Sequence, residues 1–150
     1  MMNMKMVYLD YNCFQRGFDD PGQVKIQMET LACEEIFARA ERKAIRLIWS
    51  FMHEDENVLC PFLERKAAIA RLADLCKVRI GPTREIHDLA LDFQRKAKLS
   101  AKDSIHLACA FAAKSAFFIT CDDDLIKRSA RLDNEMKVVN PVEYIREVDE

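Results

Sequence analysis

The chain has 150 residues, of which 50% are hydrophobic and 32% charged, with only three glycines and four prolines. This composition is typical of a helix-rich globular protein and argues against a disordered chain or a repeat protein. The formal net charge of -2 provides no overall attraction to nucleic acid, so such contacts would have to come from local basic clusters. We expect one domain over residues 1–150 that buries about two thirds of its unfolded surface.

The six cysteines are widely spaced, and the sequence contains no Cys-x-x-Cys pair that would indicate a structural zinc site. They are Cys13, Cys33, Cys60, Cys76, Cys109 and Cys121. Several lie within apolar patterns, as reduced core cysteines do. The first residues contain no long apolar run of a signal peptide, and no stretch approaches the roughly 18 apolar residues of a membrane span. We therefore expect a reduced cytoplasmic protein without a membrane segment.

Two short apolar runs end at polar residues, one near each end of the chain. Met6–Leu9 is followed by Asp10 and Asn12. Ala116–Thr120 runs into Asp122. Runs of this length are typical of buried strands, and ligand sites in parallel sheets lie beyond the carboxyl ends of the strands. If both strands join one sheet, they bring carboxylates to the same edge, although aspartate and asparagine also favour ordinary turns after strands.

A helix is expected from Gln23 to about Lys43, because apolar residues recur there at helical spacing. The expected apolar stripe consists of Val24, Met28, Leu31, Ala32, Ile36 and Ala40. The glutamates of this helix are expected to be solvated: Glu29, Glu34, Glu35 and Glu41. The residues before it, Gln15–Gly22, are expected to form a loop because they contain Gly, Pro and paired Asp.

A second strand is expected at Ala44–Ser50, and an acidic stretch with Glu54, Asp55 and Glu56 follows it. This is the third group of carboxylates that comes directly after an apolar strand. His53 lies within the stretch, but no second histidine stands four residues later. A zinc site is therefore not indicated, and we expect this histidine to be solvated.

The remaining pattern alternates helices with short strands. Further helices are expected from Pro61 to about Cys76, from Thr83 to about Ala97, from Ser100 to about Ala112, at Leu125–Leu132 and at Val142–Val148. Further strands are expected at Val78–Ile80 and Lys137–Val139. This order predicts an α/β protein, a single-domain α/β/α sandwich with a mostly parallel central sheet.

Asp103 stands three residues after Ser100, where a capping box and the helix dipole would by themselves favour a carboxylate. His106, on the same helix, has apolar neighbours and is expected to pack or to support another group. Each acidic position has such an ordinary explanation, so the hypothesis of a site depends on their convergence. Carboxylates brought together repel one another, and their hard oxygen atoms select Mg²⁺ or Mn²⁺.

With these pieces in this order, the chain resembles the PIN-domain ribonucleases, the broad group that includes the VapC-like toxins. The matching motifs, which lie between Met6 and about Ser129, are Val7–Asn12, Ser50 with Glu56 six positions later, Lys102–Ala110 and Phe118–Asp122. The resemblance implies a PIN-like fold and hydrolysis of RNA with Mg²⁺ or Mn²⁺ as the cofactor. It also implies RNA as the substrate, an antitoxin protein as the partner of a toxin, and a homodimer.

The resemblance further implies a set of catalytic acids, namely Asp10, Glu56, Asp103 and Asp122. Of these, Asp10, Asp103 and Asp122 would bind the metal. The supporting polar residues would be Asn12, Thr120 and Asp124. Glu54 and Asp55 leave the choice of the second acid open, although the family spacing from Ser50 selects Glu56.

Two alternative functions are also compatible with parts of this sequence. A PIN-like module could bind RNA or a protein without cutting, which a full set of acids argues against. An aspartate-based phosphatase with Asp10 as nucleophile would need a second aspartate at the position of Asn12.

Local positive charge for RNA would come from three clusters: Arg39, Arg42, Lys43 and Arg46; Arg95, Lys96, Lys98 and Lys102; Lys127, Arg128 and Arg131.

Overall fold

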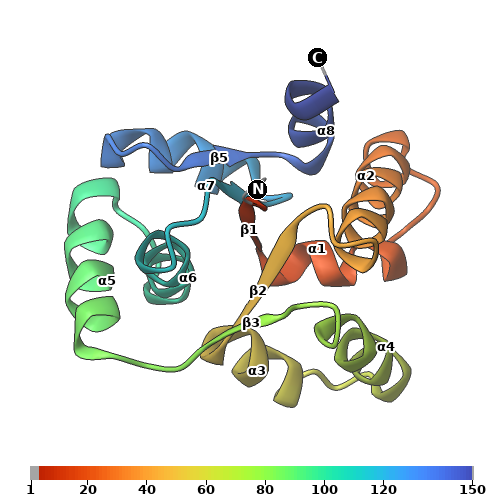
Figure 1. Ribbon diagram of the computed structural model, residues 1–150, viewed down its shortest axis with the longest axis horizontal. Coiled ribbons are helices and arrows are strands. Elements are labelled where there is room, and N and C mark those ends of the chain that lie inside the picture. The colour runs from red at the N-terminus through yellow and green to blue at the C-terminus, as the bar shows by residue number, and fades with distance from the viewer. Residues whose placement is uncertain (1–3, 150) are drawn as a thin grey trace.

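The computed structural model describes residues 4–149, and a five-stranded sheet forms its centre (Figure 1). The strands are β1 (Met6–Leu9), β2 (Arg46–Ser50), β3 (Val78–Ile80), β4 (Phe117–Ile119) and β5 (Lys137–Val139). They are arranged in the order β3-β2-β1-β4-β5, and every pairing is parallel. All five carboxyl ends therefore meet at one edge, with β1 in the middle between β2 and β4.

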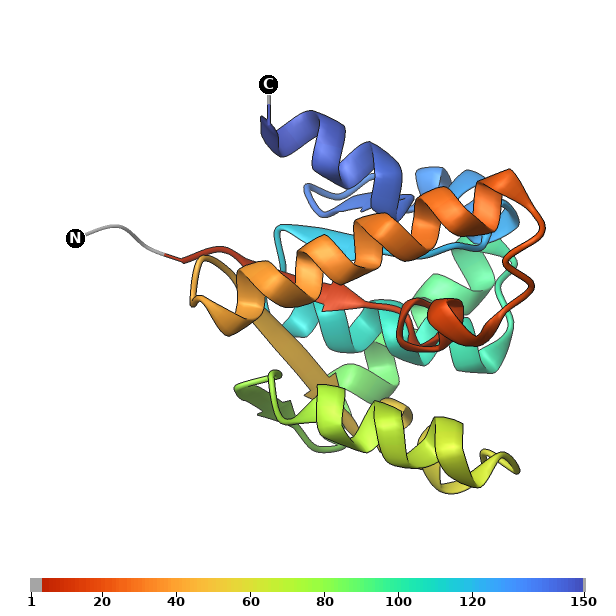
Figure 2. The same cartoon turned by 90° about the vertical axis from the view of Figure 1, so that its right-hand side faces the viewer.

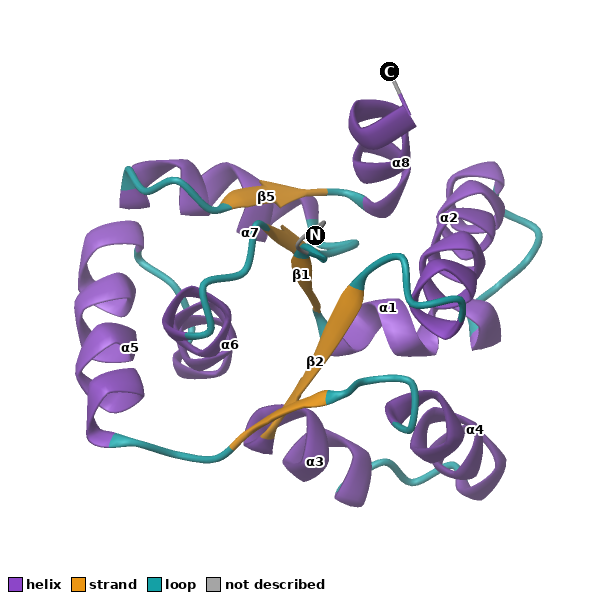
Figure 3. Cartoon of the chain, in the orientation of Figure 1, coloured by secondary structure: helices purple, strands orange, loops and turns teal. Residues whose placement is uncertain are grey.

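Eight α-helices accompany the sheet within the described residues. They are α1 (Tyr11–Gln15), α2 (Val24–Glu41), α3 (Phe51–Val58), α4 (Leu63–Ala73), α5 (Arg84–Ala97), α6 (Ala101–Ala112), α7 (Asp123–Ser129) and α8 (Pro141–Asp149). Two short 3-10 turns follow α1 and α7, at Arg16–Phe18 and Ala130–Leu132. The expected α/β/α sandwich is confirmed, since helices lie on both sides of the strands (Figure 3).

Each face of the sheet has its own hydrophobic core, because successive side chains of a strand point to opposite faces. Val7 and Leu9 pack with the apolar residues of α1, α2, α4 and α8. Tyr8, between them, packs on the other face with α5, α6 and α7. Both cores reach the central strand, so β1 is buried from both sides.

The register of β1 and β4 determines how Asp10 and Thr120 lie relative to each other. Leu9 pairs with Ile119, and the amide of Asp10 donates to the Ile119 carbonyl oxygen at 2.8 Å. This bond extends the pairing by one residue, so Asp10 and Thr120 leave the sheet side by side. In Figure 2, β1 runs directly into α1 at this edge.

The short helix α1 was not predicted from the sequence. It begins two residues after Leu9 without a side-chain cap, and it buries Tyr11, Cys13 and Phe14 against the sheet. Five residues are too few for a helical pattern to be recognised, and the tertiary contacts stabilise this turn. The expected loop at Gln15–Gly22 accordingly contains the end of this helix and a 3-10 turn.

The helix α2 was expected, but the face that it buries differs from the prediction. Val24, Met28 and Leu31 are exposed, whereas Glu29 is buried with 1% of its surface exposed. The Glu29 carboxylate accepts hydrogen bonds from Arg16 Nε at 2.9 Å and from Asn140 Nδ2 at 2.5 Å. These polar partners lie on the core side of the helix, so they, and not the apolar stripe, set the orientation of its first half.

No helix in residues 4–149 combines the length and the apolarity that crossing a membrane requires.

Candidate functional site

A cavity of about 430 Å³ lies at the carboxyl edge of the sheet, and all four predicted acids line it. Asp10 follows β1, Glu56 lies on α3, Asp103 lies in the first turn of α6, and Asp122 precedes α7. The parallel sheet and the helices that follow its strands therefore bring together carboxylates from distant parts of the sequence. Asp10 and Asp122 are 112 positions apart.

Asp10 is the most buried of the four acids, with 7% of its surface exposed. Its Oδ2 atom accepts hydrogen bonds from Thr120 Oγ1 at 2.8 Å and from Asn12 Nδ2 at 3.2 Å. Asn12 in turn accepts through Oδ1 from the amide of Cys121 at 3.1 Å. Two of the three predicted supporting residues, Asn12 and Thr120, therefore contact Asp10. No residue in 4–149 donates a hydrogen bond to its second oxygen, Oδ1.

The carboxylates of the cavity affect one another electrostatically. Burial raises the pKa of the Asp10 carboxyl, and the charges of Glu56 and Asp103 act in the same direction. Burial also raises the pKa of Asp103, and the charge of Asp122 adds to this effect. Both shifts have the sign expected for anions that are desolvated and crowded, so a bound cation would relieve an unfavourable arrangement.

Glu56 is held by a chain of hydrogen bonds that begins in the core. Ser50 Oγ lies 2.8 Å from Tyr8 Oη, which lies 2.6 Å from His106 Nδ1. The other ring nitrogen, Nε2, hydrogen-bonds Glu56 Oε1. Tyr8 stays a neutral phenol because burial raises its pKa far above the usual value. The expectation that His106 supports a neighbouring group is confirmed.

The other two acids of α3 point elsewhere. Glu54 accepts a hydrogen bond from Trp49 Nε1 at 2.8 Å, and Asp55 is exposed. Neither lines the acidic cavity. Because consecutive helical residues project about 100° apart, only Glu56 of the three faces the other acids.

Asp122 has a second role besides lining the cavity. Its Oδ1 atom caps α7 by accepting hydrogen bonds from the amides of Asp124 at 3.0 Å and Leu125 at 3.1 Å. Asp124, predicted as a supporting residue, is exposed and pairs with Arg128 at 2.8 Å. The structure therefore does not bring Asp124 into the cavity.

Asp103 occupies the position that the capping pattern predicted. Its amide donates to Ser100 Oγ at 3.1 Å, and its carboxyl faces the cavity. The capping role and the role in the site are thus compatible, because the amide and the side chain of one residue serve them separately.

The expectation that His53 is solvated was wrong, since it is fully buried. Its Nδ1 atom accepts from the Ser50 amide at 2.9 Å, and Nε2 donates to the Leu9 carbonyl at 2.6 Å. Burial lowers the pKa of this imidazole far below its usual value, so it is neutral. His53 is a structural part of the cap of α3 and contacts none of the acids.

Four cavity residues were not predicted to contribute to the site: Tyr11, Gln15, Asp19 and Ser100. Asp19 forms an ion pair with Arg16 at 2.9 Å. Tyr11, Gln15 and Asp19 lie in α1 and the segment after it, where no local sequence pattern indicated the orientation of their side chains. Lys102, predicted only as part of a basic cluster, also lines the cavity, with Nζ 3.8 Å from Glu56 Oε2.

The basic clusters are distributed unevenly about the site. Lys102 is the one member of the three clusters that borders the acidic cavity. Arg39 lines a different cavity together with Lys5 and Lys137, near the amino ends of the strands. Arg128 donates to Asp124 and to the Lys98 carbonyl oxygen. Positive charge next to the acids is therefore sparse.

The four acids surround the cavity without closing on one point. In residues 4–149 no three carboxylates have oxygen atoms within 4.8 Å of one another; the one set of metal-ligating atoms that does so consists of three cysteines. The acids differ in this respect from a closed calcium cage.

Comparison with known proteins gives a likeness of fold. Neither a family model nor a curated protein matches this sequence. Among solved structures, the crystal structure of PAE2754 from Pyrobaculum aerophilum is similar. The two share 9% identity with a TM-score of 0.54, and the alignment covers 99% of this chain and 100% of that chain. At this identity the similarity concerns the fold alone.

Proposed function

We propose that this protein is a metal-dependent ribonuclease that hydrolyses phosphodiester bonds of single-stranded RNA at the acidic cavity. The observation that carries the proposal is the convergence of Asp10, Glu56, Asp103 and Asp122 from four separate elements onto one cavity. A fold does not require four acids at one edge, and burial raises the pKa of two of them, Asp10 and Asp103. A bound cation would offset the repulsion between these carboxylates. The convergence also supports the resemblance to PIN-domain ribonucleases.

The donor set fits Mg²⁺ or Mn²⁺. The cavity offers carboxylates, two hydroxyls and two side-chain amides. The one imidazole that lines it, His106, is already bonded to Glu56 and Tyr8. Asp10, Asp103 and Asp122 would bind the ion. When bound, such an ion lowers the pKa of a coordinated water and neutralises charge on the phosphate.

The side chains around the cavity have different roles in the proposed reaction. Thr120 and Asn12 hold Asp10 in one orientation through its Oδ2 atom. His106 orients Glu56, which is the acid best placed to orient or accept a proton from the attacking water. Lys102, exposed beside Glu56, supplies the positive charge that a phosphate on the substrate requires.

An exposed aromatic residue near the cavity, Phe62, supports a single-stranded substrate. A second groove shares Tyr11, Gln15, Glu56 and Lys102 with the acidic cavity and continues to Phe62. Phe62 is 58% exposed, and the Arg65 guanidinium lies 4.8 Å from its ring centroid. Unpaired bases stack on aromatic and guanidinium planes of this kind.

The phosphatase alternative is disfavoured by the role of Asn12. Its side-chain amide donates to Asp10 and Thr120 and accepts from the Cys121 amide. Asn12 therefore holds Asp10 in position and cannot serve as the general acid that a phosphatase needs.

The six free cysteines support the cytoplasm as the compartment. An antitoxin partner and a homodimer remain predictions.

The test is cleavage of a fluorescently labelled single-stranded RNA by the purified protein. We expect cleavage with Mg²⁺ or Mn²⁺, none in excess chelator, and none with Asp10→Asn. Asp124→Asn is the matched control, because this aspartate lies near the site in sequence but outside the cavity. Cleavage that persists in chelator or in Asp10→Asn would contradict the proposal. Binding of RNA without cleavage would favour the non-catalytic module.

A further inference from the structure

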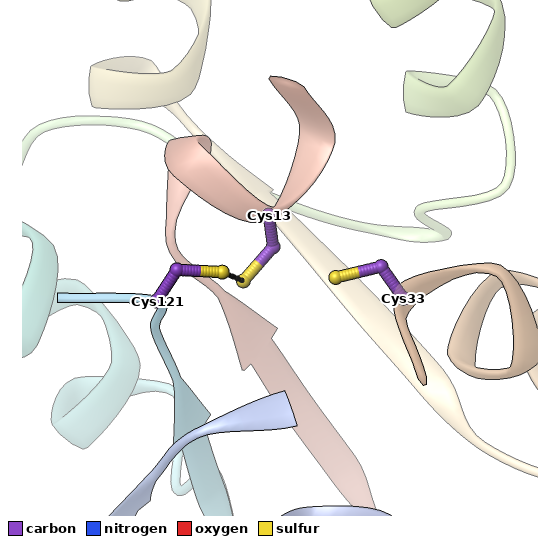
Figure 4. Close-up of side chains that lie close together, drawn as sticks. All are labelled: Cys13, Cys33 and Cys121. Carbon is purple, nitrogen blue, oxygen red and sulfur yellow. Dashed lines mark hydrogen bonds between the residues drawn. The ribbon is translucent and has the colours of Figure 1, made fainter. Parts of the chain in front are cut away.

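Three cysteines from separate parts of the chain lie close together, as Figure 4 shows. Cys13 lies on α1, Cys33 on α2, and Cys121 two residues after the end of β4. Their sulfur atoms all lie within 4.8 Å of one another, and the Cys13 and Cys121 sulfurs are 4.0 Å apart. The side chains are buried, with 1%, 3% and 6% of their surfaces exposed. The proposed ribonuclease chemistry uses none of them.

The spacing of the sulfurs matches ligation of a single ion. Thiolates bind metals at about 2.3 Å, so three of them placed around one ion in a plane lie about 4.0 Å apart. The Cys13–Cys121 separation already has this value. A disulfide would need two sulfurs about 2.05 Å apart and would leave Cys33 without a partner. The trio thus has the geometry of a three-coordinate site with little rearrangement.

The surroundings determine which ion suits the site. Within residues 4–149, no histidine, aspartate, glutamate or further cysteine joins the trio as a fourth ligand. Structural zinc almost always takes four ligands, whereas soft thiolates without a fourth donor suit Cu(I). The hard ions of the acidic cavity do not compete for sulfur.

We propose that Cys13, Cys33 and Cys121 form a buried binding site for one thiophilic metal ion, with Cu(I) preferred to Zn(II). The bound ion would connect α1, α2 and the segment after β4. Cys13 adjoins Asn12, and Cys121 lies between Thr120 and Asp122. An ion at this place therefore stabilises the backbone that carries the acids, and its binding does not depend on the ribonuclease proposal.

The test is anaerobic titration of the reduced, metal-free protein with Cu(I) in the presence of a chromophoric Cu(I) chelator. We expect one equivalent to be withdrawn from the chelator by the parent protein, together with a rise in melting temperature. Cys33→Ser should lose both effects. Cys76→Ser and Cys109→Ser are matched controls, because these buried cysteines lie outside the trio and should bind as the parent does.

X-ray absorption of the Cu(I)-loaded parent protein gives a second measurement that needs no variant to fold. We expect three sulfur atoms in the first coordination shell. The proposal is overturned if the parent fails to compete for Cu(I), if Cys33→Ser binds as well as the parent, or if fewer than three sulfurs surround the ion. Uptake of one Zn(II) but no Cu(I), with the same dependence on Cys33, would overturn the choice of ion and keep the site.

Discussion

The Nε2 atom of His106 hydrogen-bonds the carboxylate of Glu56, 50 positions away in the sequence. At its other nitrogen, the same ring accepts from Tyr8 Oη at 2.6 Å, and this phenol also contacts Ser50 Oγ at 2.8 Å. The core thereby holds one acid of the cavity in place through an imidazole. Positioning contacts of this kind next to a metal site typically contribute 10- to 100-fold in metal affinity or activity.

We expect His106→Leu to lower RNA cleavage by about 10- to 100-fold and to raise the Mn²⁺ concentration needed for half-maximal rate. His106→Gln retains an amide near the position of Nε2 and should recover part of both losses. His53→Gln is the control, since His53 is equally buried but contacts no carboxylate; it should lower the melting temperature without changing the Mn²⁺ requirement. An unchanged Mn²⁺ dependence in His106→Leu would show that the hydrogen bond has no functional role.

The three neighbouring acids of α3 should differ sharply in cleavage assays. Glu56→Gln is expected to reduce the rate by about two orders of magnitude, which is typical for loss of a positioned acid or base. Glu54→Gln and Asp55→Asn should cleave as the parent does, because one bonds Trp49 and the other faces solvent. Loss of activity in Glu54→Gln with activity retained in Glu56→Gln would reject the assignment.

The stability of the metal-free protein should fall as the pH rises through the range in which Asp10 ionises. Burial raises the folded-state pKa above the usual 3.8, so the folded state binds this proton more tightly than the unfolded state. Asp10→Asn should therefore be more stable than the parent at neutral pH in chelator, and the gain should vanish below about pH 3.8. It should also lose the stabilisation by added Mn²⁺.

Denaturant unfolding of the two proteins at a series of pH values measures this effect. Asp124→Asn serves as the exposed control and should show no comparable gain. If Asp10→Asn is markedly less stable than the parent at neutral pH in chelator, the carboxylate supports the fold and repulsion in the cavity is not the dominant effect.

The exposed ring of Phe62 is expected to bind an RNA base. Phe62→Ala should weaken binding of single-stranded RNA, measured without divalent metal, by about 1 to 3 kcal/mol, the usual value for one stacked base. Leu63→Ala, which removes a neighbouring side chain that is 81% exposed, should bind normally. Equal affinities of the two variants would show that the substrate follows another path from the cavity.

Glu29 should be essential to the stability of the fold although it does not line the acidic cavity. Removing one partner of a buried ion pair costs about 3 to 5 kcal/mol, so Glu29→Ala is expected to lower the free energy of unfolding by that amount. Glu34→Ala, on the exposed side of the same helix, should change it by less than about 0.5 kcal/mol. Urea denaturation of both variants gives the comparison, and similar midpoints would contradict the role of the Arg16–Glu29 pair.

Local patterns determined much of this protein. Short apolar runs predicted the strands, and the positions of Asp10 and Asp122 within two residues of the ends of two such runs predicted an acidic edge. Ser100 and Thr83 cap α6 and α5 as their sequences indicated, through bonds to amides three residues later. These features were predictable because a strand end or a helix cap depends on the free energy of a few adjacent residues.

The tertiary structure decided the orientation of the side chains. Glu29 is buried because Asn140, 111 positions away, donates to it. Glu56 belongs to the cavity because His106 bonds it, whereas Trp49 binds Glu54. Helical or strand periodicity cannot distinguish such choices, since each depends on a partner contributed by a distant segment. The cysteine trio has the same origin: 108 residues separate Cys13 from Cys121, and only the parallel pairing of β1 with β4 brings their sulfurs together.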